Sequence, residues 1–190
     1  LNAEEVAHRL ADELGVPTAP LTRVNGTHTL AELVDGSDTP LDLASRARYL
    51  EPESIEDKLN SLYAKYADTA QGRATGLLDA ILANRDRHHG NWVVRDLDDQ
   101  FWAIDHARKM TDTVPVVKDG TVTWGVQTTV SWFWNRMIGN VTVKEATDAI
   151  AALRRVKADF DRLGMTGNYE ASMKRAEIIL GLAEGRLKSA

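Results

Sequence analysis

A polar stretch, Asn84-Arg-Asp-Arg-His-His-Gly-Asn91, separates two different patterns near the middle of the chain. Before it, apolar residues recur at helical spacing, which predicts an amphipathic helix over 71–83. After it, two runs rich in aromatic and β-branched residues predict short strands at 92–94 and 101–104, joined by the acidic turn 96–99. Any fold of this chain must therefore place a helix end, a polar loop and a β-hairpin next to one another.

This arrangement brings together side chains that suit a metal ion. A hairpin returns the chain to the place where it began, so Asn91 before the first strand and Asp105 after the second are expected at one end of it. A carboxylate and an amide oxygen are hard ligands of the kind that bind Mg²⁺, whose other ligands are often phosphate oxygens and waters. Asp86, one loop turn away, can then face a substrate hydroxyl. Phosphoryl transfer needs this division of roles.

The rest of the sequence predicts an α+β fold in which helices dominate. Further helices are expected at 2–14, 41–50, 54–68, 142–159 and 169–187. Asn25-Gly26 and Asp119-Gly120 each lie between β-prone runs and predict two more hairpins, because such residue pairs tolerate positive φ. The glycine-bearing break at 34–38 is interpreted as a hinge between two lobes.

The polar stretch and the residues around Asp105 resemble the catalytic and metal-binding motifs of the phosphatidylinositol 3-/4-kinase-like superfamily. More narrowly, the sequence is similar to the bacterial branch of small kinase-like proteins, with the HipA-type kinases as more distant relatives. The superfamily patterns are Asp-Arg-His-x-x-Asn and Ile-Asp-Phe or Ile-Asp-His. Here they match Asp86-Arg-His-His-Gly-Asn91 and Ile104-Asp-His106. The resemblance implies that Asp86 is the catalytic aspartate, that His88 lies near the transferring phosphate, and that Asn91 and Asp105 bind metal.

The resemblance extends upstream of the polar stretch. A helix carrying Glu4 and Glu5, a hairpin and the segment 30–36 look like the regulatory helix, the last two N-lobe strands and the hinge. One of the two glutamates, with Glu5 preferred, would then pair with the ATP-binding lysine. Backbone groups around the hinge would meet adenine, at Glu32, Leu33 and Val34.

The implied architecture is protein-kinase-like. Residues 1–36 would be the remnant of an N-lobe, and 37–190 a mostly helical C-lobe that carries the catalytic hairpin. A kinase of this type needs a β-strand lysine and a phosphate-covering loop ahead of the regulatory helix. The chain begins at Leu1 without a methionine, so we expect it to be part of a longer chain.

The expected function is Mg²⁺-dependent transfer of the ATP γ-phosphoryl group to a hydroxyl. One alternative is a non-catalytic kinase-like module (a pseudokinase) that serves as a binding or structural part of a larger protein or assembly; the missing lysine favours it. A second alternative is nucleotidyl transfer on a kinase-like fold.

Composition narrows the partners and the kinds of metal site. The formal net charge of -5 argues against nucleic acid and makes a lipid acceptor less attractive than a protein or a small molecule. The chain has no cysteine, which excludes thiolate zinc sites. No apolar run is long enough to span a bilayer, and a cytoplasmic location is expected.

Simpler structural roles remain open for several of these residues. Asp86 and Asp105 could be a helix-end carboxylate and a turn former. Arg85 and Arg87 could pair with nearby carboxylates, and for Arg85 this is the favoured interpretation. The aromatic cluster 132–134 is expected in the core of the helical part.

Overall fold

The computed structural model describes residues 2–19, 21–23, 29–31, 37–39, 43, 54–84, 87, 90–95, 99–104, 110, 112–124 and 140–189. Its helices are α1 (Asn2–Leu14), α3 (Ile55–Ala67), α4 (Ala70–Leu82), α6 (Val143–Arg155), α7 (Lys157–Arg162) and α8 (Thr166–Ala183). Its strands are β1 (Leu21–Arg23), β2 (Thr29–Ala31), β3 (Ser37–Asp38), β4 (Trp92–Arg95), β5 (Gln100–Ala103), β6 (Val116–Lys118), β7 (Thr121–Thr123) and β8 (Lys188–Ser189). The predicted mixed α+β class is confirmed. The expected helix at 41–50 and the aromatic cluster 132–134 fall outside the described residues, apart from residue 43.

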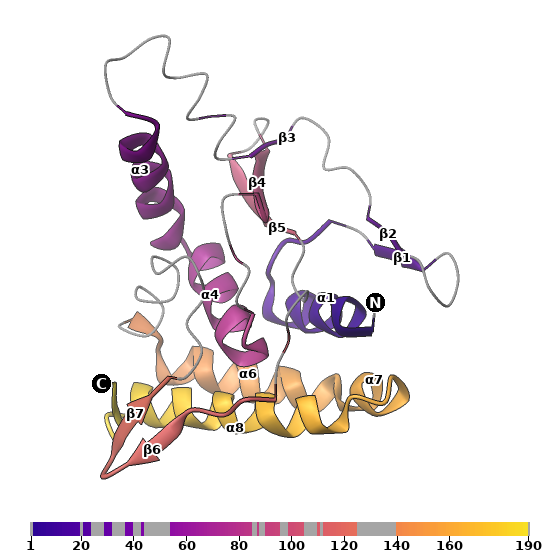
Figure 1. Ribbon diagram of the computed structural model, residues 1–190, viewed down its shortest axis with the longest axis vertical. Helices are drawn as coiled ribbons and strands as arrows, with labels where there is room; N and C mark the ends of the chain where they lie inside the picture. Colours follow the sequence, from indigo (N-terminus) through magenta and orange to yellow (C-terminus); the bar gives the residue numbers. More distant parts are fainter. Residues whose placement is uncertain are drawn as a thin grey trace.

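The helices form one packed group (Figure 1). Helices α6 and α8 run side by side, and α4 packs against α8. Helix α1 lies beside α4 and also contacts α6, while α3 continues upward from α4. The hydrophobic core is shared among these helices and the β4–β5 hairpin. Among the described residues, then, the helix expected in the first lobe shares its core with helices of the second, and the boundary at 36/37 stays a prediction.

Helix α1 forms where the sequence predicted it and ends as predicted. Gly15 has φ 67°, and the N–H groups of Gly15 and Val16 donate to the carbonyls of Asp12 and Ala11 at 3.2 and 2.9 Å. This is the Schellman arrangement, in which a left-handed glycine closes the helix. Asn2, the first residue of α1, donates its Nδ2 to the Leu163 carbonyl at 3.1 Å.

The predicted hairpins are confirmed in their pairing. Strands β1 and β2 are antiparallel, as are β6 and β7. In the second pair Asp119 and Gly120 have φ values of 50° and 73°. Two consecutive positive φ angles in a two-residue loop make a type I′ turn, whose twist matches that of paired strands.

Three boundaries differ from the sequence predictions. The helix expected over 142–159 breaks at Val156 into α6 and α7. The last helix starts at Thr166 and ends at Ala183, because Gly185 turns with φ 70° and Lys188–Ser189 pair in parallel with β7. Within the expected hinge at 34–38, the two described residues, Ser37 and Asp38, form β3, which pairs with β4 on the side away from β5.

None of the described helices has the length and apolar character to cross a membrane.

Candidate functional site

Helix α4 ends directly before the polar stretch, in a backbone conformation that is unusual for its sequence. Ala83 has φ 53°, in the left-handed region that glycine normally occupies. The N–H groups of Ala83 and Asn84 donate to the carbonyls of Ala80 and Asp79 at 3.3 and 2.9 Å. This second Schellman arrangement turns the chain sharply away from the helix axis and into residues 84–91.

A buried polar network lies under this turn. Asp79, Asn84 and Arg87 have exposed fractions of 1%, 0% and 0%. The guanidinium of Arg87 binds the Asp79 carboxylate with two parallel bonds: Nε donates to Oδ2 and Nη2 to Oδ1, each at 3.0 Å. Asn84 Nδ2 donates to the same Oδ1 at 2.9 Å. Bidentate, charge-assisted geometry of this kind fixes both partners.

The same arginine contacts the residue before β4 and the residue after β5. Its Nη1 donates to the carbonyl of Asn91 and, at 2.7 Å, to that of Ile104. These two residues also contact each other, since the Ile104 N–H donates to the Asn91 carbonyl at 3.1 Å. The pairing continues the strand register, in which Trp92 lies opposite Ala103. The first and last residues of the hairpin therefore meet as the sequence predicted, at the end opposite the turn, with Asn91 beside the residue that precedes Asp105.

The structure describes only some of the predicted site residues. Asn91 is 5% exposed and lies at the end of the hairpin opposite the turn, beside Ile104. Asp86, His88 and Asp105 fall outside the described residues, as do Glu32, Leu33 and Val34. Whether Asn91 binds metal and whether the others act as expected stay predictions.

Glu5 is described, and its carboxylate binds a residue of α7. Arg162 Nη2 donates to Glu5 Oε1 at 2.6 Å and to Asp159 Oδ1 at 3.0 Å. These contacts raise the pKa of the Arg162 guanidinium, with Glu5 the largest cause. The expected pairing of Glu5 with an ATP-binding lysine stays a prediction. In this arrangement a lysine would have to share that carboxylate with Arg162.

The sequence analysis allowed Arg87 to pair with a nearby carboxylate but did not identify Asp79 as its partner. Arg87 makes this buried pair, and Arg85, for which such pairing was the favoured interpretation, lies outside the described residues. A signal was present in α4. Asp79 lies in the middle of the stripe Leu77, Leu78, Ile81 and Leu82, and a carboxylate on a buried face requires a partner.

A second buried arginine supports the same region from α8. Arg175, 1% exposed, donates from Nε to the Ile81 carbonyl and from Nη1 to the Thr113 carbonyl, both at 2.6 Å. Burial lowers the pKa of its guanidinium to about 10, although the charge of Asp112 acts in the opposite direction. Arg175 thus joins the last turn of α4 to the segment that follows the hairpin.

Helix α3 packs along the hairpin and also binds its turn at Asp99. Trp92 and Phe101 pack on Tyr63 and Tyr66, with ring centroids 5.0 to 6.1 Å apart. Tyr66 Oη donates to Asp99 Oδ1 at 2.5 Å, and Lys65 Nζ to Asp99 Oδ2 at 2.6 Å. Burial, followed by the bond to Asp99, raises the pKa of the Tyr66 phenol. The hairpin is therefore fixed at both ends.

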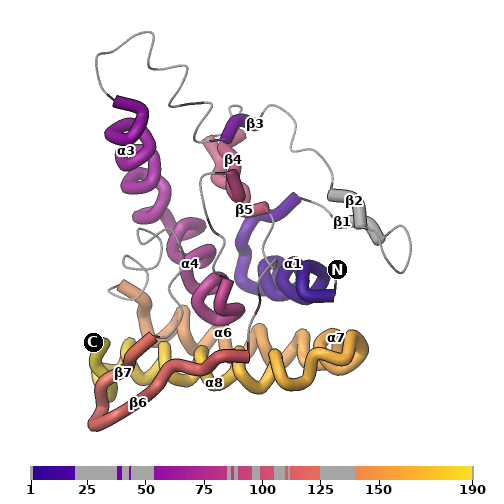
Figure 2. The backbone as a smooth tube through the Cα atoms, in the orientation of Figure 1, coloured from indigo at the N-terminus to yellow at the C-terminus, as the bar shows by residue number. Residues whose placement is uncertain are grey.

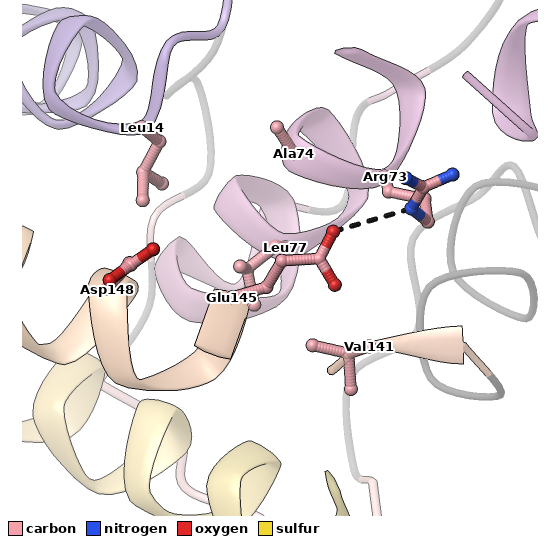
Figure 3. Close-up of a pocket in the computed structure, with 7 residues that line it drawn as sticks. All are labelled: Leu14, Arg73, Ala74, Leu77, Val141, Glu145 and Asp148. Carbon is pink, nitrogen blue, oxygen red and sulfur yellow. Dashed lines mark hydrogen bonds and ion pairs between the residues drawn. The ribbon is translucent and has the colours of Figure 1, made fainter. Parts of the chain in front are cut away.

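A small cavity lies on another part of α4 (Figure 3). Its volume is about 110 Å³, and its walls come from α1, α4, α6 and Val141. Arg73 and Glu145 face each other at this cavity, with Nε 3.4 Å from Oε1. Pockets that bury a small ligand are usually of roughly 300 to 1,000 Å³. The cavity is too small for a nucleotide, and none of its lining residues belongs to 84–91 or 104–105.

Comparisons do not add a relative to this description. No protein-family model matches the chain, and none of the curated proteins matches it. In the part of the chain that the structure describes, no three histidine, aspartate or glutamate side chains gather as a metal-binding group.

Proposed function

We propose that this chain is the catalytic half of a kinase-like phosphotransferase that moves the γ-phosphoryl group of ATP to a hydroxyl. The observation that carries the proposal is the contact between the residue before β4 and the residue after β5: the Ile104 N–H donates to the Asn91 carbonyl at 3.1 Å. Asp105 follows Ile104 directly in the sequence. The chain order of helix, polar loop, hairpin and carboxylate is the order that the motif resemblance requires.

The donor set at this position fits magnesium. Asn91 supplies an amide oxygen and Asp105 a carboxylate, both hard ligands, and the chain has no cysteine that could supply a thiolate. Mg²⁺ held there would neutralise charge on the β- and γ-phosphates during transfer.

The remaining roles follow from the chemistry of the transfer. Asp86 orients the acceptor hydroxyl and takes its proton as the hydroxyl oxygen attacks the γ-phosphorus. The bond between the γ-phosphorus and the β–γ bridging oxygen breaks, and ADP leaves with that oxygen. His88 stabilises charge on the transferred group. Glu5 pairs with an ATP-binding lysine, and the backbone at Glu32, Leu33 and Val34 binds adenine.

The kinase-like fold, the two-lobe division at residue 36/37 and a cytoplasmic location belong to this proposal. The acceptor is a protein or a small molecule in preference to a lipid, because the chain is acidic. A longer gene product would supply the lysine and the phosphate-covering loop.

A non-catalytic kinase-like module is the second candidate, and one observation favours it. The Glu5 carboxylate is already bound by Arg162 at 2.6 Å. A module of this kind would bind partners through the kinase-like surface and transfer nothing. Nucleotidyl transfer is the third, and it differs in the product: mass spectrometry would find added AMP in place of added phosphate.

The test is thermal unfolding of this chain, and of the gene product that contains it, with ATP in the presence and absence of Mg²⁺. A ligand at a hundredfold excess over its Kd stabilises a protein by about 2.7 kcal/mol. We expect stabilisation that requires Mg²⁺ and is lost in Asp105→Ala. The matched control is Glu177→Gln, which removes an exposed carboxylate on α8. Stabilisation that survives Asp105→Ala would contradict the metal assignment, and its absence from the intact gene product would contradict ATP binding.

A further inference from the structure

The buried Arg87–Asp79 pair makes contacts that the packing of the fold does not require. An apolar pair of the same volume is often as good as or better than a buried ion pair for stability, because desolvation of the two charges offsets their attraction. An apolar pair could fill the space beneath the turn at Ala83. It could not bind backbone carbonyls on two separate segments, as Arg87 binds those of Asn91 and Ile104.

The contact with Asn91 is not needed to satisfy a buried acceptor. The Asn91 carbonyl already accepts the Ile104 N–H at 3.1 Å, so the bond from Arg87 Nη1 is a second one. A guanidinium is planar, and here its opposite edge is held by both oxygens of Asp79. The direction in which Nη1 points is therefore set by α4 and not by the hairpin.

We propose that Arg87, oriented by Asp79, is a positioning residue for the metal ligands. One guanidinium holds the main chain at Asn91 to the main chain at Ile104, and Asp105 follows Ile104 directly in the sequence. This inference rests on the proposed function, because the ligands it positions are those of the Mg²⁺ site. It adds a pair of residues that touch neither metal nor substrate, and it links the ligand spacing to the last turn of α4.

Arg175 provides a matched comparison inside the same molecule. It is equally buried and also donates to two backbone carbonyls, those of Ile81 and Thr113. Neither carbonyl belongs to the end of the hairpin where Asn91 and Ile104 meet. Replacing Arg175 therefore removes similar interactions from the core without releasing Asn91 or Ile104.

The experiment uses three variants of the full chain. In Arg87→Lys an ammonium keeps the charge opposite Asp79 but lacks the planar group that binds Asp79 through Nε and Nη2 and both carbonyls through Nη1. In the double variant Asp79→Leu/Arg87→Met the pair is apolar, so no charge is left buried alone. Arg175→Lys is the control. Circular dichroism checks that each variant folds. The rise in Tm caused by ATP is then measured as a function of Mg²⁺ concentration, which gives the half-maximal Mg²⁺ concentration for each variant.

We expect the half-maximal Mg²⁺ concentration to rise by about 10- to 100-fold in both Arg87 variants, as for other residues that orient metal ligands. In Arg175→Lys the Tm should fall while the Mg²⁺ requirement stays within about twofold of wild type, since its carbonyl partners lie elsewhere. A folded Arg87→Lys or double variant with the wild-type Mg²⁺ requirement would overturn the positioning role. So would failure of both Arg87 variants to fold while Arg175→Lys folds, because the pair would then serve folding alone.

A second readout does not depend on nucleotide binding. Amide hydrogen exchange of Ile104 reports its bond to Asn91, and that of Ala103 reports its bond to Pro17 at 2.9 Å. If exchange in Arg87→Lys increases over wild type more at Ile104 than at Ala103, Arg87 holds Ile104 to Asn91 whether or not the wild type binds Mg²⁺·ATP. Absence of Mg²⁺·ATP binding from wild type would contradict the proposed function, and with it the role of Arg87 toward metal ligands. Unchanged exchange at Ile104 would contradict the inference alone.

Discussion

The N–H of Ala103 donates to the carbonyl of Pro17 over 2.9 Å, and Thr18 forms a parallel bridge to the same residue. Figure 2 shows the chain leaving α1 and rising beside β5. Thr18 is also joined to α1 through a hydrogen bond of 2.8 Å to His8 Nδ1. The segment after α1 thus completes the edge of the sheet two residues before Asp105. Helix α1 and strand β5, which precedes Asp105 in the sequence, are consequently linked through residues 15–18.

Replacement of Asp86 tests the catalytic role separately from metal binding. In Asp86→Asn the general base is lost, and we expect kcat to fall by about 10²- to 10⁴-fold. The KM for ATP should change by less than about threefold, because Asp86 is not expected to bind nucleotide. Steady-state kinetics with the acceptor substrate measure both. A large rise in KM at unchanged kcat would assign Asp86 to binding.

At Gly72 the backbone of α4 lies too close to the last turn of α3 for a side chain. A Cβ there would lie 1.9 Å from the Tyr66 carbonyl oxygen, which is backbone and cannot rotate away. We expect Gly72→Ala to lower the free energy of unfolding by about 1–3 kcal/mol, as for other overpacking changes. Urea unfolding is the measurement.

The control for this change is Gly167→Ala in the first turn of α8, where a Cβ would meet nothing within 4 Å. Alanine is favoured over glycine in helices by up to about 1 kcal/mol, so this variant should be neutral or more stable. Equal destabilisation by both changes would show that the close approach at Gly72 is not the cause.

The turn of the β4–β5 hairpin depends on a phenol. Tyr66→Phe removes the bond from Oη to Asp99, and hydrogen bonds of this kind contribute about 1 kcal/mol or somewhat more when the acceptor is charged. Lys65→Met removes the neighbouring ion pair, whose side chains are 53% and 59% exposed, and should cost less than about 1 kcal/mol. Urea unfolding measures the loss of unfolding free energy in both variants. A larger loss in Lys65→Met than in Tyr66→Phe would contradict the prediction.

Glu145 makes stability depend on pH in the acid range. Burial alone would raise the pKa of its carboxyl, but bonds from the Thr142 N–H, the Thr142 hydroxyl and Arg73 together hold the pKa below its ordinary value of 4.5. The stabilisation is fully present above that ordinary value and is lost as the pH falls through the lower folded-state pKa, because the unfolded chain then binds the proton more readily.

The measurement is the urea midpoint as a function of pH for wild type and Glu145→Gln. Glutamine can still form the capping box with Thr142 but carries no charge for Arg73. The difference between the two proteins should be largest above pH 4.5 and should shrink as the carboxyl becomes protonated. Glu177→Gln on the exposed face of α8 is the control. A difference that stays constant across this range would contradict the assignment.

Local sequence was sufficient for much of the secondary structure. Helix α6 begins where a helix was predicted, because the capping box formed by Thr142 and Glu145 joins residues only three apart. Asp119-Gly120 produced the expected turn, because both residues accept positive φ. The β4–β5 hairpin formed between the predicted runs and closed beside Asn91. For the candidate site, the sequence therefore indicated which segments meet.

Tertiary structure decided which side chains hold those segments together. No local rule predicts that the guanidinium of Arg87 binds Asp79, which lies eight residues earlier in the sequence. That contact depends on the left-handed turn at Ala83, which ends α4 between the two residues. The parallel pairing of β8 with β7 and the bond between Pro17 and Ala103 also join residues remote in sequence. Short-range hydrogen bonds and φ preferences are properties of neighbouring residues and can be read from the sequence, whereas burial of a charge becomes possible only where the fold supplies its partner.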